Sequence, residues 1–123
     1  RKDLRGKRVV AGIRSLVMGD LNAVSLATAA HAKILIRAGG LPSARRVLGG
    51  RPFPRERDVE ALVIDDHIGI AMIPSRASAA RCEFAESFSR CQLAVEAAGF
   101  HTSPGKRLRG ATSGVLIGAE ILG

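Results

Sequence analysis

The chain has 123 residues, a formal net charge of +8 and 46% hydrophobic residues. This length allows one small domain, and this composition excludes both a disordered chain and a membrane protein. The longest apolar stretches, 62–64 and 68–73, are far shorter than the ~20 residues that a membrane-spanning helix needs. We therefore expect a folded domain with its own core and no membrane partner.

Two cysteines, Cys82 and Cys91, are nine positions apart. On one helix they would point to opposite sides, roughly 13 Å apart, which is too far for a disulfide. Free thiols are typical of a reducing compartment, so we expect an intracellular protein, in the nucleus or the cytoplasm. The chain begins without Met, and we expect it to be part of a longer polyprotein.

Positive charge is concentrated in the first half of the chain. Residues 1–58 contain 13 basic and 4 acidic side chains, a balance of +9, whereas residues 59–123 contain 6 and 7, a balance of −1. A basic surface attracts polyanions, because each neutralised phosphate releases counterions. Nucleic acid is therefore the expected partner class, and a solvated arginine-rich surface is the alternative. With four Phe and no Tyr or Trp, the contacts should be mainly to the nucleic-acid backbone.

The first predicted element is a strand over 8–17, where β-branched residues alternate partially. Asp20 predicts the N-cap of an amphipathic helix of about 18 residues. Its apolar stripe runs through Leu21, Val24, Thr28, His31, Leu35 and Ala38. Gly39-Gly40 predicts the end of this helix, and the basic run 43–58 predicts a loop.

Two apolar runs, 60–64 and 67–73, predict a β-hairpin whose connection is Asp65-Asp66. A second helix should end at Gly99, and the second apolar stripe runs through Ala80, Phe84, Phe88, Cys91, Val95 and Ala98. A last strand, 115–121, should pair with a segment across or near 107–113. This order predicts an α+β fold in which an antiparallel sheet carries two helices on one face.

His31 and Cys91 lie on the two apolar stripes, so both are predicted core residues. No second His or Cys stands near His31 at the spacing of zinc ligands, so a structural zinc site is not expected.

Asp65-Asp66 is the pair of residues that most suggests chemistry. Its two adjacent carboxylates lie between apolar strands, and Mg²⁺ binds carboxylate oxygens while keeping water and substrate phosphates as further ligands. A carboxylate pair at a hairpin tip would be half of a two-metal site. The alternative is a solvated acidic turn.

Four segments resemble reverse transcriptases in family order. The stretch 63–66 resembles the Tyr-x-Asp-Asp motif, with Val63 at the Tyr position. The stretch 18–24 resembles the motif Phe-Gly-Leu-x-Asn-Ala-Pro, because it shares the Gly and the Asn-Ala three residues later. The stretch 99–106 resembles the element after the second helix of the polymerase palm, and 115–121 is similar to the primer-grip hairpin.

The resemblance implies that residues 1–123 are a partial, ferredoxin-like palm domain of a retrotransposon-type element, with the first catalytic motif and the fingers upstream. It implies an RNA-directed DNA polymerase, a nucleotidyltransferase that uses two Mg²⁺ or Mn²⁺ ions at a primer 3′-hydroxyl. The implied partners are an RNA or DNA template-primer and deoxynucleoside triphosphates. Asp65 would be the metal ligand and Asp66 a supporting one, and the isolated chain should be inactive because its carboxylate set is incomplete.

The resemblance also implies roles outside the carboxylate pair. Gly19, Asn22 and Val63 would contact template, primer or nucleotide, and Lys106 would donate a proton to the pyrophosphate leaving group. The structural alternatives are a turn glycine, a polar residue at a helix start and a surface charge. For the whole chain, the alternatives are a small non-catalytic α+β nucleic-acid-binding module and a decayed retroelement copy.

Overall fold

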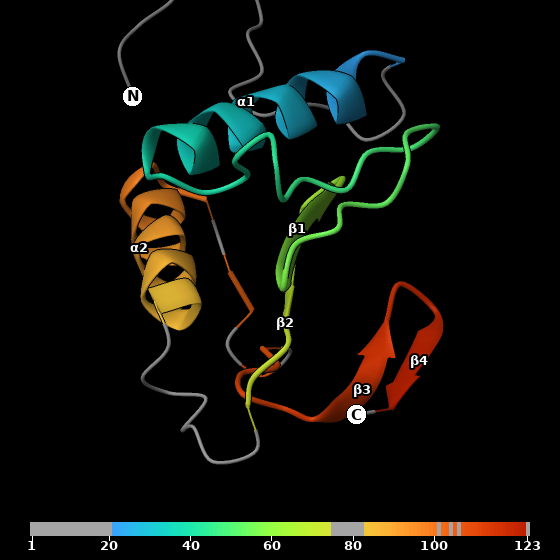
Figure 1. Cartoon of the computed structure of the whole chain (residues 1–123). Coiled ribbons are helices and arrows are strands. Elements are labelled where there is room, and N and C mark those ends of the chain that lie inside the picture. Colours follow the sequence, from blue (N-terminus) through green and yellow to red (C-terminus); the bar gives the residue numbers. More distant parts are fainter. Residues whose placement is uncertain (1–20, 75–82, 101, 104, 106, 123) are drawn as a thin grey trace, which may run out of the picture.

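The computed structural model describes residues 21–74, 83–100, 102, 103, 105 and 107–122 (Figure 1). Two helices and four strands follow one another in the order α1 (Ala23–Arg37), β1 (Asp58–Val63), β2 (Asp66–Ala71), α2 (Glu83–Ala97), β3 (Ser113–Leu116) and β4 (Ala119–Leu122). The strands form two antiparallel two-stranded sheets, β1–β2 and β3–β4. The α+β class is therefore confirmed, whereas the expected single sheet is not found in the described residues. The predicted strand over 8–17 and the predicted N-cap Asp20 lie outside them.

Helix α1 is shorter than predicted, with 15 residues that follow Asn22 as the N-cap. His31 and Leu35 are buried as expected, but Leu21 is 96% exposed and Val24 53%. The stripe is buried only in the second half of the helix, where Leu35 joins a core cluster with residues of α2. Periodicity shows which side of a helix faces a core, but it does not show how far along the helix that core extends.

Helix α2 also has 15 residues, and Cys91 and Val95 on its stripe are buried as predicted. Together with Leu35 of α1 and Leu41 of the following loop, they form the core cluster. The helix ends as expected before Gly99, whose φ of +82° is a conformation that glycine adopts without steric cost. The predicted stripe member Ala80 and the second cysteine, Cys82, lie outside the described residues.

The hairpin β1–β2 is confirmed, but its predicted connection was wrong by one residue. Val63 pairs with Asp66, so the two connecting residues are Ile64 and Asp65. Of these two, only Ile64 has a positive φ, at +57°, which is the pattern of a type II′ turn. This turn matches the right-handed twist of the strands, and it leaves Asp66 inside the ladder as the first residue of β2.

The single strand predicted over 115–121 was also wrong, because a turn divides it into β3 and β4. Leu116 pairs with Ala119 around Ile117 and Gly118. Both turn residues have positive φ, +52° and +76°, which is the pattern of a type I′ turn. Gly118 makes this turn accessible, since glycine has no Cβ to oppose a positive φ.

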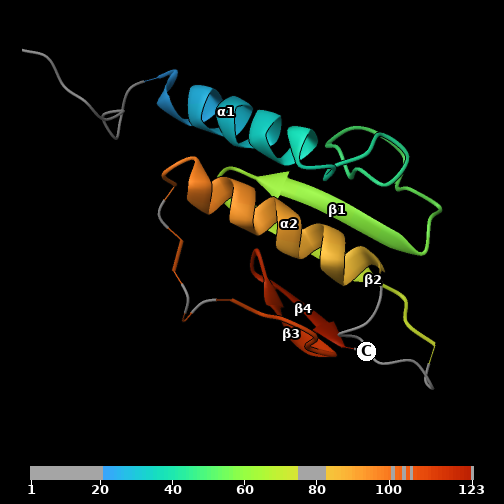
Figure 2. The ribbon, with the colours of Figure 1, turned by 90° about the vertical axis from the view of Figure 1, so that its left-hand side faces the viewer.

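The helices and the second hairpin lie on opposite sides of β1–β2 (Figures 1 and 2). Residues directly opposite each other in the ladder share a face, and one face carries Glu60, Gly69, Leu62 and His67. On this helix-facing side, His67 stacks on Phe88 of α2 with ring centroids 4.3 Å apart. Leu62 packs against the core cluster that both helices build.

The other face of β1–β2, the outer face, is apolar. It forms an open pocket of about 160 Å³ together with the tip of the second hairpin and the loop before β1. The lining residues are Val47, Phe53, Val59, Ala61, Ile68, Ile70, Leu116, Ile117 and Ile121. One face of the β1–β2 hairpin thus packs against the helices, and the other lines the apolar pocket. Side chains alternate between these two faces along each strand.

Candidate functional site

The predicted metal ligands lie together at the tip of the β1–β2 hairpin. Asp65 is the second residue of the turn and Asp66 is the first residue of β2, and both are exposed. Among the described residues, neither carboxylate has a partner in a hydrogen bond or an ion pair. Both carboxylates are therefore accessible to a ligand from solvent.

Of the other residues to which the resemblance gives a role, the structure describes two. Val63 is the ladder partner of Asp66, so the two share the outer face at the hairpin tip. Asn22 is exposed at the N-cap of α1, the helix that lies over this hairpin in Figure 2. Gly19 and Lys106 lie outside the described residues. The structure thus brings together Val63, Asp65 and Asp66.

The two carboxylates fit part of a magnesium site. Mg²⁺ is commonly held by one or two carboxylates, and substrate phosphates and water complete its six ligands. Asp65 and Asp66 supply that number of carboxylates at an exposed position. In the described part of the chain, no cluster of three or more His, Cys, Asp or Glu side chains has the arrangement of a metal site. Further ligands would have to come from a bound phosphate or from groups outside the described residues.

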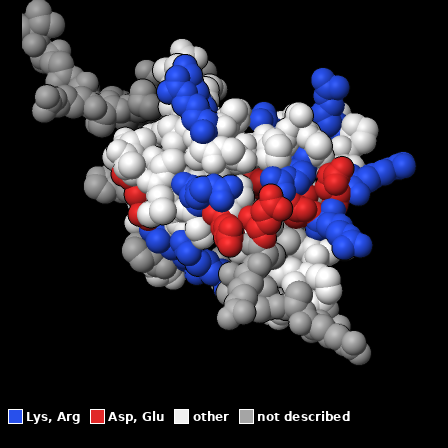
Figure 3. Space-filling view, turned by 60° about the vertical axis from the view of Figure 1, so that its left-hand side comes forward, with Lys and Arg blue, Asp and Glu red and all other residues white. Residues whose placement is uncertain are grey.

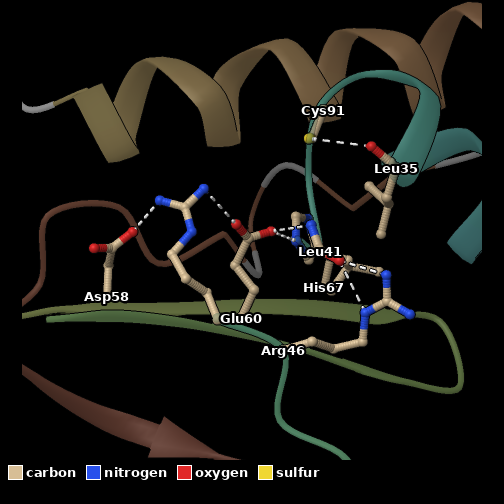
Figure 4. Close-up of polar contacts among 8 residues, drawn as sticks. Leu35, Leu41, Arg46, Asp58, Glu60, His67 and Cys91 are labelled. Atoms are coloured by element: carbon tan, nitrogen blue, oxygen red, sulfur yellow. Dashed lines mark hydrogen bonds and ion pairs between the residues drawn. The ribbon is translucent and has the colours of Figure 1, made fainter. Parts of the chain in front are cut away.

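A buried polar cluster at the middle of β1 was missed by sequence reasoning (Figure 4). Glu60 is only 2% exposed, and its Oε2 accepts a hydrogen bond from the Leu41 backbone N–H at 2.8 Å. The same oxygen lies 3.0 Å from His67 Nε2. Arg45 forms an ion pair with Asp58 and lies 3.7 Å from Glu60 Oε1. The Glu60 carboxylate therefore has three partners, two from the loop after α1 and one from β2.

The surroundings of Glu60 decide its charge. Burial raises the pKa of this carboxyl. The hydrogen bonds from His67 and Leu41 and the charges of His67 and Arg45 lower the pKa, and together they outweigh the effect of burial. The net pKa lies below the ordinary value of 4.5, so Glu60 is ionised at neutral pH.

The pKa of His31 is also lowered, but for an imidazole this favours the neutral form. Burial and, second, the charge of His67 lower its pKa below 6.5, while the charge of Asp65 acts against this shift. Its ring lies 5.6 Å from that of Phe100, and it is buried as predicted. His31 is therefore a buried core residue, as the apolar stripe predicted, and its lowered pKa favours the neutral form.

The Glu60 cluster attaches the loop after α1 to the edge of β1. Val47 N–H donates to Glu60 O at 2.8 Å, and Glu60 N–H donates to Arg45 O at 2.9 Å. Arg46 donates from its guanidinium to Leu41 O, 2.9 Å from Nε. Residues 41–47 are thus held beside β1, and the cluster has a structural role that positions the rest of the loop.

One signal in the sequence points to this cluster. Glu60 is a charged residue between Val59 and the apolar run 61–64, and a buried charge requires partners. Its partners come from positions 41, 45 and 67, and nothing in the local sequence shows that these positions meet.

Comparison of the chain with protein-family models, with curated proteins and with solved structures finds no match. In the part of the chain that the structure describes, neither helix is long and apolar enough to cross a membrane. The assignment of a function therefore depends on the residues of this chain and their arrangement.

Proposed function

We propose that the chain is the central and C-terminal part of the palm of a reverse-transcriptase-type, RNA-directed DNA polymerase. The observation that carries this proposal is the exposed carboxylate pair Asp65-Asp66 at a hairpin tip, without a hydrogen bond or ion pair to any described residue. Two adjacent like charges repel each other, and a bound cation would remove that repulsion. A pair left open to solvent in this way suits metal-dependent phosphate chemistry.

The order of the elements also supports the proposal. Asn22 stands at the start of α1, the carboxylate pair lies between β1 and β2, and α2 ends before Gly99. The second hairpin then follows at the segment that resembles a primer grip. The resemblance to reverse transcriptases requires the same succession of helix, hairpin, helix and hairpin.

In this proposal, Asp65 and Asp66 hold Mg²⁺, which when bound lowers the pKa of the primer 3′-hydroxyl and neutralises charge on the transferred phosphate. The ladder fixes the backbone of Asp66, while Asp65 projects from the turn. Val63 shares the outer face with Asp66 and offers an apolar surface to the primer or nucleotide. Asn22 offers an amide that can donate to and accept from template or nucleotide.

A non-catalytic nucleic-acid-binding module is the second candidate. It is favoured by the lack of a third acidic, His or Cys ligand beside the pair among the residues described. It is also favoured by exposed arginines in the loop before β1. The two candidates differ in what a divalent metal does to nucleic-acid binding, because only the first one places a metal between the protein and a phosphate.

The test is the affinity for a fluorescein-labelled primer–template, measured by fluorescence anisotropy with Mg²⁺ and with EDTA. We expect Mg²⁺ to strengthen binding by wild-type protein several-fold, and this effect to be lost in Asp65→Asn/Asp66→Asn. The matched control is Glu83→Gln/Glu86→Gln, which removes two acidic charges from the first turn of α2.

The control should retain the Mg²⁺ effect. Equal binding with and without Mg²⁺, together with unchanged or tighter binding by Asp65→Asn/Asp66→Asn, would overturn the polymerase proposal and leave the binding module. Primer extension by the chain should not exceed that of Asp65→Ala, because the described residues supply no third ligand beside the two adjacent carboxylates of a two-metal site.

A further inference from the structure

The loop between α1 and β1 carries cations that the fold does not use. Arg45 and Arg46, near its start, are engaged in the contacts that attach the loop to β1. In contrast, Arg51, Arg55 and Arg57 are exposed, and their side chains form no ion pair or hydrogen bond with a described residue. Figure 3 shows Lys and Arg side chains projecting at the right-hand end of the molecule, where the loop lies in Figure 2.

The same segment presents an aromatic ring to solvent. Phe53 is 66% exposed, although it borders the outer-face pocket. The other three phenylalanines are at least partly buried, since Phe84 and Phe88 cover Gly69 and Phe100 packs against the core cluster. Phe53 is thus the one strongly exposed aromatic ring in the described part of the chain.

The segment is held in a limited range of conformations. Pro52 and Pro54 flank Phe53, and each proline restricts its own φ to about −65°. The loop is attached at both ends, through the bond from Val47 N–H to Glu60 O and through the start of β1 at Asp58. Groups that are fixed before binding lose less conformational entropy when a ligand arrives.

We propose that residues 51–57 are a binding site for single-stranded nucleic acid, in which the arginines contact phosphates and Phe53 stacks on a base. A cationic surface next to an exposed aromatic ring is the combination by which single strands are bound without sequence preference. The class of partner rests on the proposed function, and the site adds to it a place where an unpaired strand is held. It differs from the expectation of contacts mainly to the backbone, because Phe53 adds a contact to a base.

The position of the site relates it to the carboxylate pair. Phe53 borders the outer face of β1–β2, which is also the face of Asp66. β1 runs from the end of this loop at Asp58 to the turn that precedes Asp66. A strand that is held by Phe53 and follows β1 along the outer face would therefore lead to Asp65-Asp66.

The first test removes the charges. Binding of a fluorescein-labelled oligothymidine is measured by anisotropy over a range of salt concentrations, for wild type and for Arg51→Ala/Arg55→Ala. Since each lost phosphate contact in a single strand lowers the slope of log K against log salt by about 0.7, we expect a decrease of about 1.4 and weaker binding of about tenfold or more. Lys33→Ala/Arg90→Ala, which removes two exposed charges from the helices, is the matched control and should change the slope little. An equal change of affinity and salt slope in the loop variant and in the control variant would overturn the proposed site.

The second test removes the ring. Phe53→Ala should weaken binding of the single strand about tenfold without changing the salt slope, and Phe53→Tyr should restore it, because stacking needs a ring and no charge. Duplex DNA should bind Phe53→Ala and wild type alike. Because Phe53 is exposed, the thermal midpoint of Phe53→Ala should stay close to that of wild type. Binding to anionic vesicles or polyglutamate with the same dependence on Phe53 would contradict the proposal.

The two proposals can fail separately. Weakened binding in the loop variants without any Mg²⁺ effect at Asp65-Asp66 would support the single-strand site and overturn the polymerase. Unchanged binding in the loop variants with the Mg²⁺ effect intact would overturn the site and support the polymerase.

Discussion

At Glu60, one carboxylate joins a strand, a loop and a second strand. It accepts the Leu41 backbone N–H from the loop and bonds His67 of β2, while Arg45 lies near its second oxygen. A buried carboxylate with such partners is favourable only in its charged form, since a protonated one cannot accept from the same donors on both oxygens. The stability of the fold should therefore depend on pH through this residue.

We expect the free energy of unfolding to decrease in two steps as pH falls from 8 to 3. The pKa of His31 is lower in the folded protein than its ordinary value of 6.5, so below about pH 6.5 the unfolded chain binds more protons and stability decreases. The pKa of Glu60 is lower than 4.5, so a second decrease begins as pH approaches about 4.5 and continues through the folded pKa. Urea unfolding at a series of pH values measures both steps.

Substitutions of His31 and Glu60 show which residue causes each decrease in stability. His31→Leu should remove the first decrease and keep the second, whereas Glu60→Gln should be less stable at pH 7 and lose most of the second. A stability of wild type that is constant between pH 7 and 5 would contradict the assignment of His31 as a neutral core residue.

At the scale of elements, the contact between the end of α1 and α2 is very close at Gly40. A Cβ at this position would lie 2.5 Å from Cys91 Sγ and 3.3 Å from Leu35 O, a backbone atom of α1. We expect Gly40→Ala to destabilise the fold by about 1–3 kcal/mol, as is usual for overpacking in a core. In Gly40→Ala/Cys91→Ala the total loss should be smaller than the sum of the single losses, because the second change removes the clashing sulfur. Additive losses would show that the two helices are not this close.

The turn of the β1–β2 hairpin contains a strained residue. Ile64 is β-branched, it has a φ of +57°, and its side chain is 53% exposed. A left-handed backbone costs such a residue roughly 1–2 kcal/mol, and Gly at the first central position of a type II′ turn avoids this cost. Ile64→Gly should therefore raise the free energy of unfolding by about 1 kcal/mol in urea titrations. A decrease instead would mean that the packing of Ile64 outweighs its backbone strain.

Sequence patterns predicted elements better than connections. Both helices and the β1–β2 hairpin were predicted because their apolar periodicity is local, and Gly99 marked the end of α2 correctly. The turn at Ile64 and Asp65 was missed because its positive φ falls on isoleucine, a residue type that argues against such a conformation. The turn at Gly118 could have been predicted from its glycine.

The candidate site was predicted in part for the same reason. The adjacent carboxylates Asp65 and Asp66 are visible in the sequence, and their exposed place at a hairpin tip follows from the flanking strands. For the Glu60 cluster, the sequence shows a charged residue beside an apolar run but not its partners, because these are brought together only by the fold. The exposure of Phe53 was equally hidden, since a phenylalanine in a sequence is expected to lie in the core.

At the scale of the whole molecule, the proposed functions use two ends of one hairpin. The carboxylate pair lies at the turn, and the arginine-rich loop lies at the start of β1, with the helices on one face between them (Figure 2). A nucleic acid that contacts both ends would run along β1 on the outer side. The loop would supply sequence-independent affinity, and the turn would supply the metal-dependent contact.

The central claim is that Asp65 and Asp66 bind a divalent metal, and the most direct measurement is a two-dimensional ¹H–¹⁵N NMR spectrum with substoichiometric Mn²⁺. Mn²⁺ broadens the signals of nearby amides, so we predict selective loss of the signals of residues 63–67, its reversal by excess Mg²⁺, and its absence in Asp65→Asn/Asp66→Asn. Broadening that is equal across the exposed carboxylates, with the amides of Glu83 and Glu86 affected as strongly as those of residues 63–67, would contradict the claim.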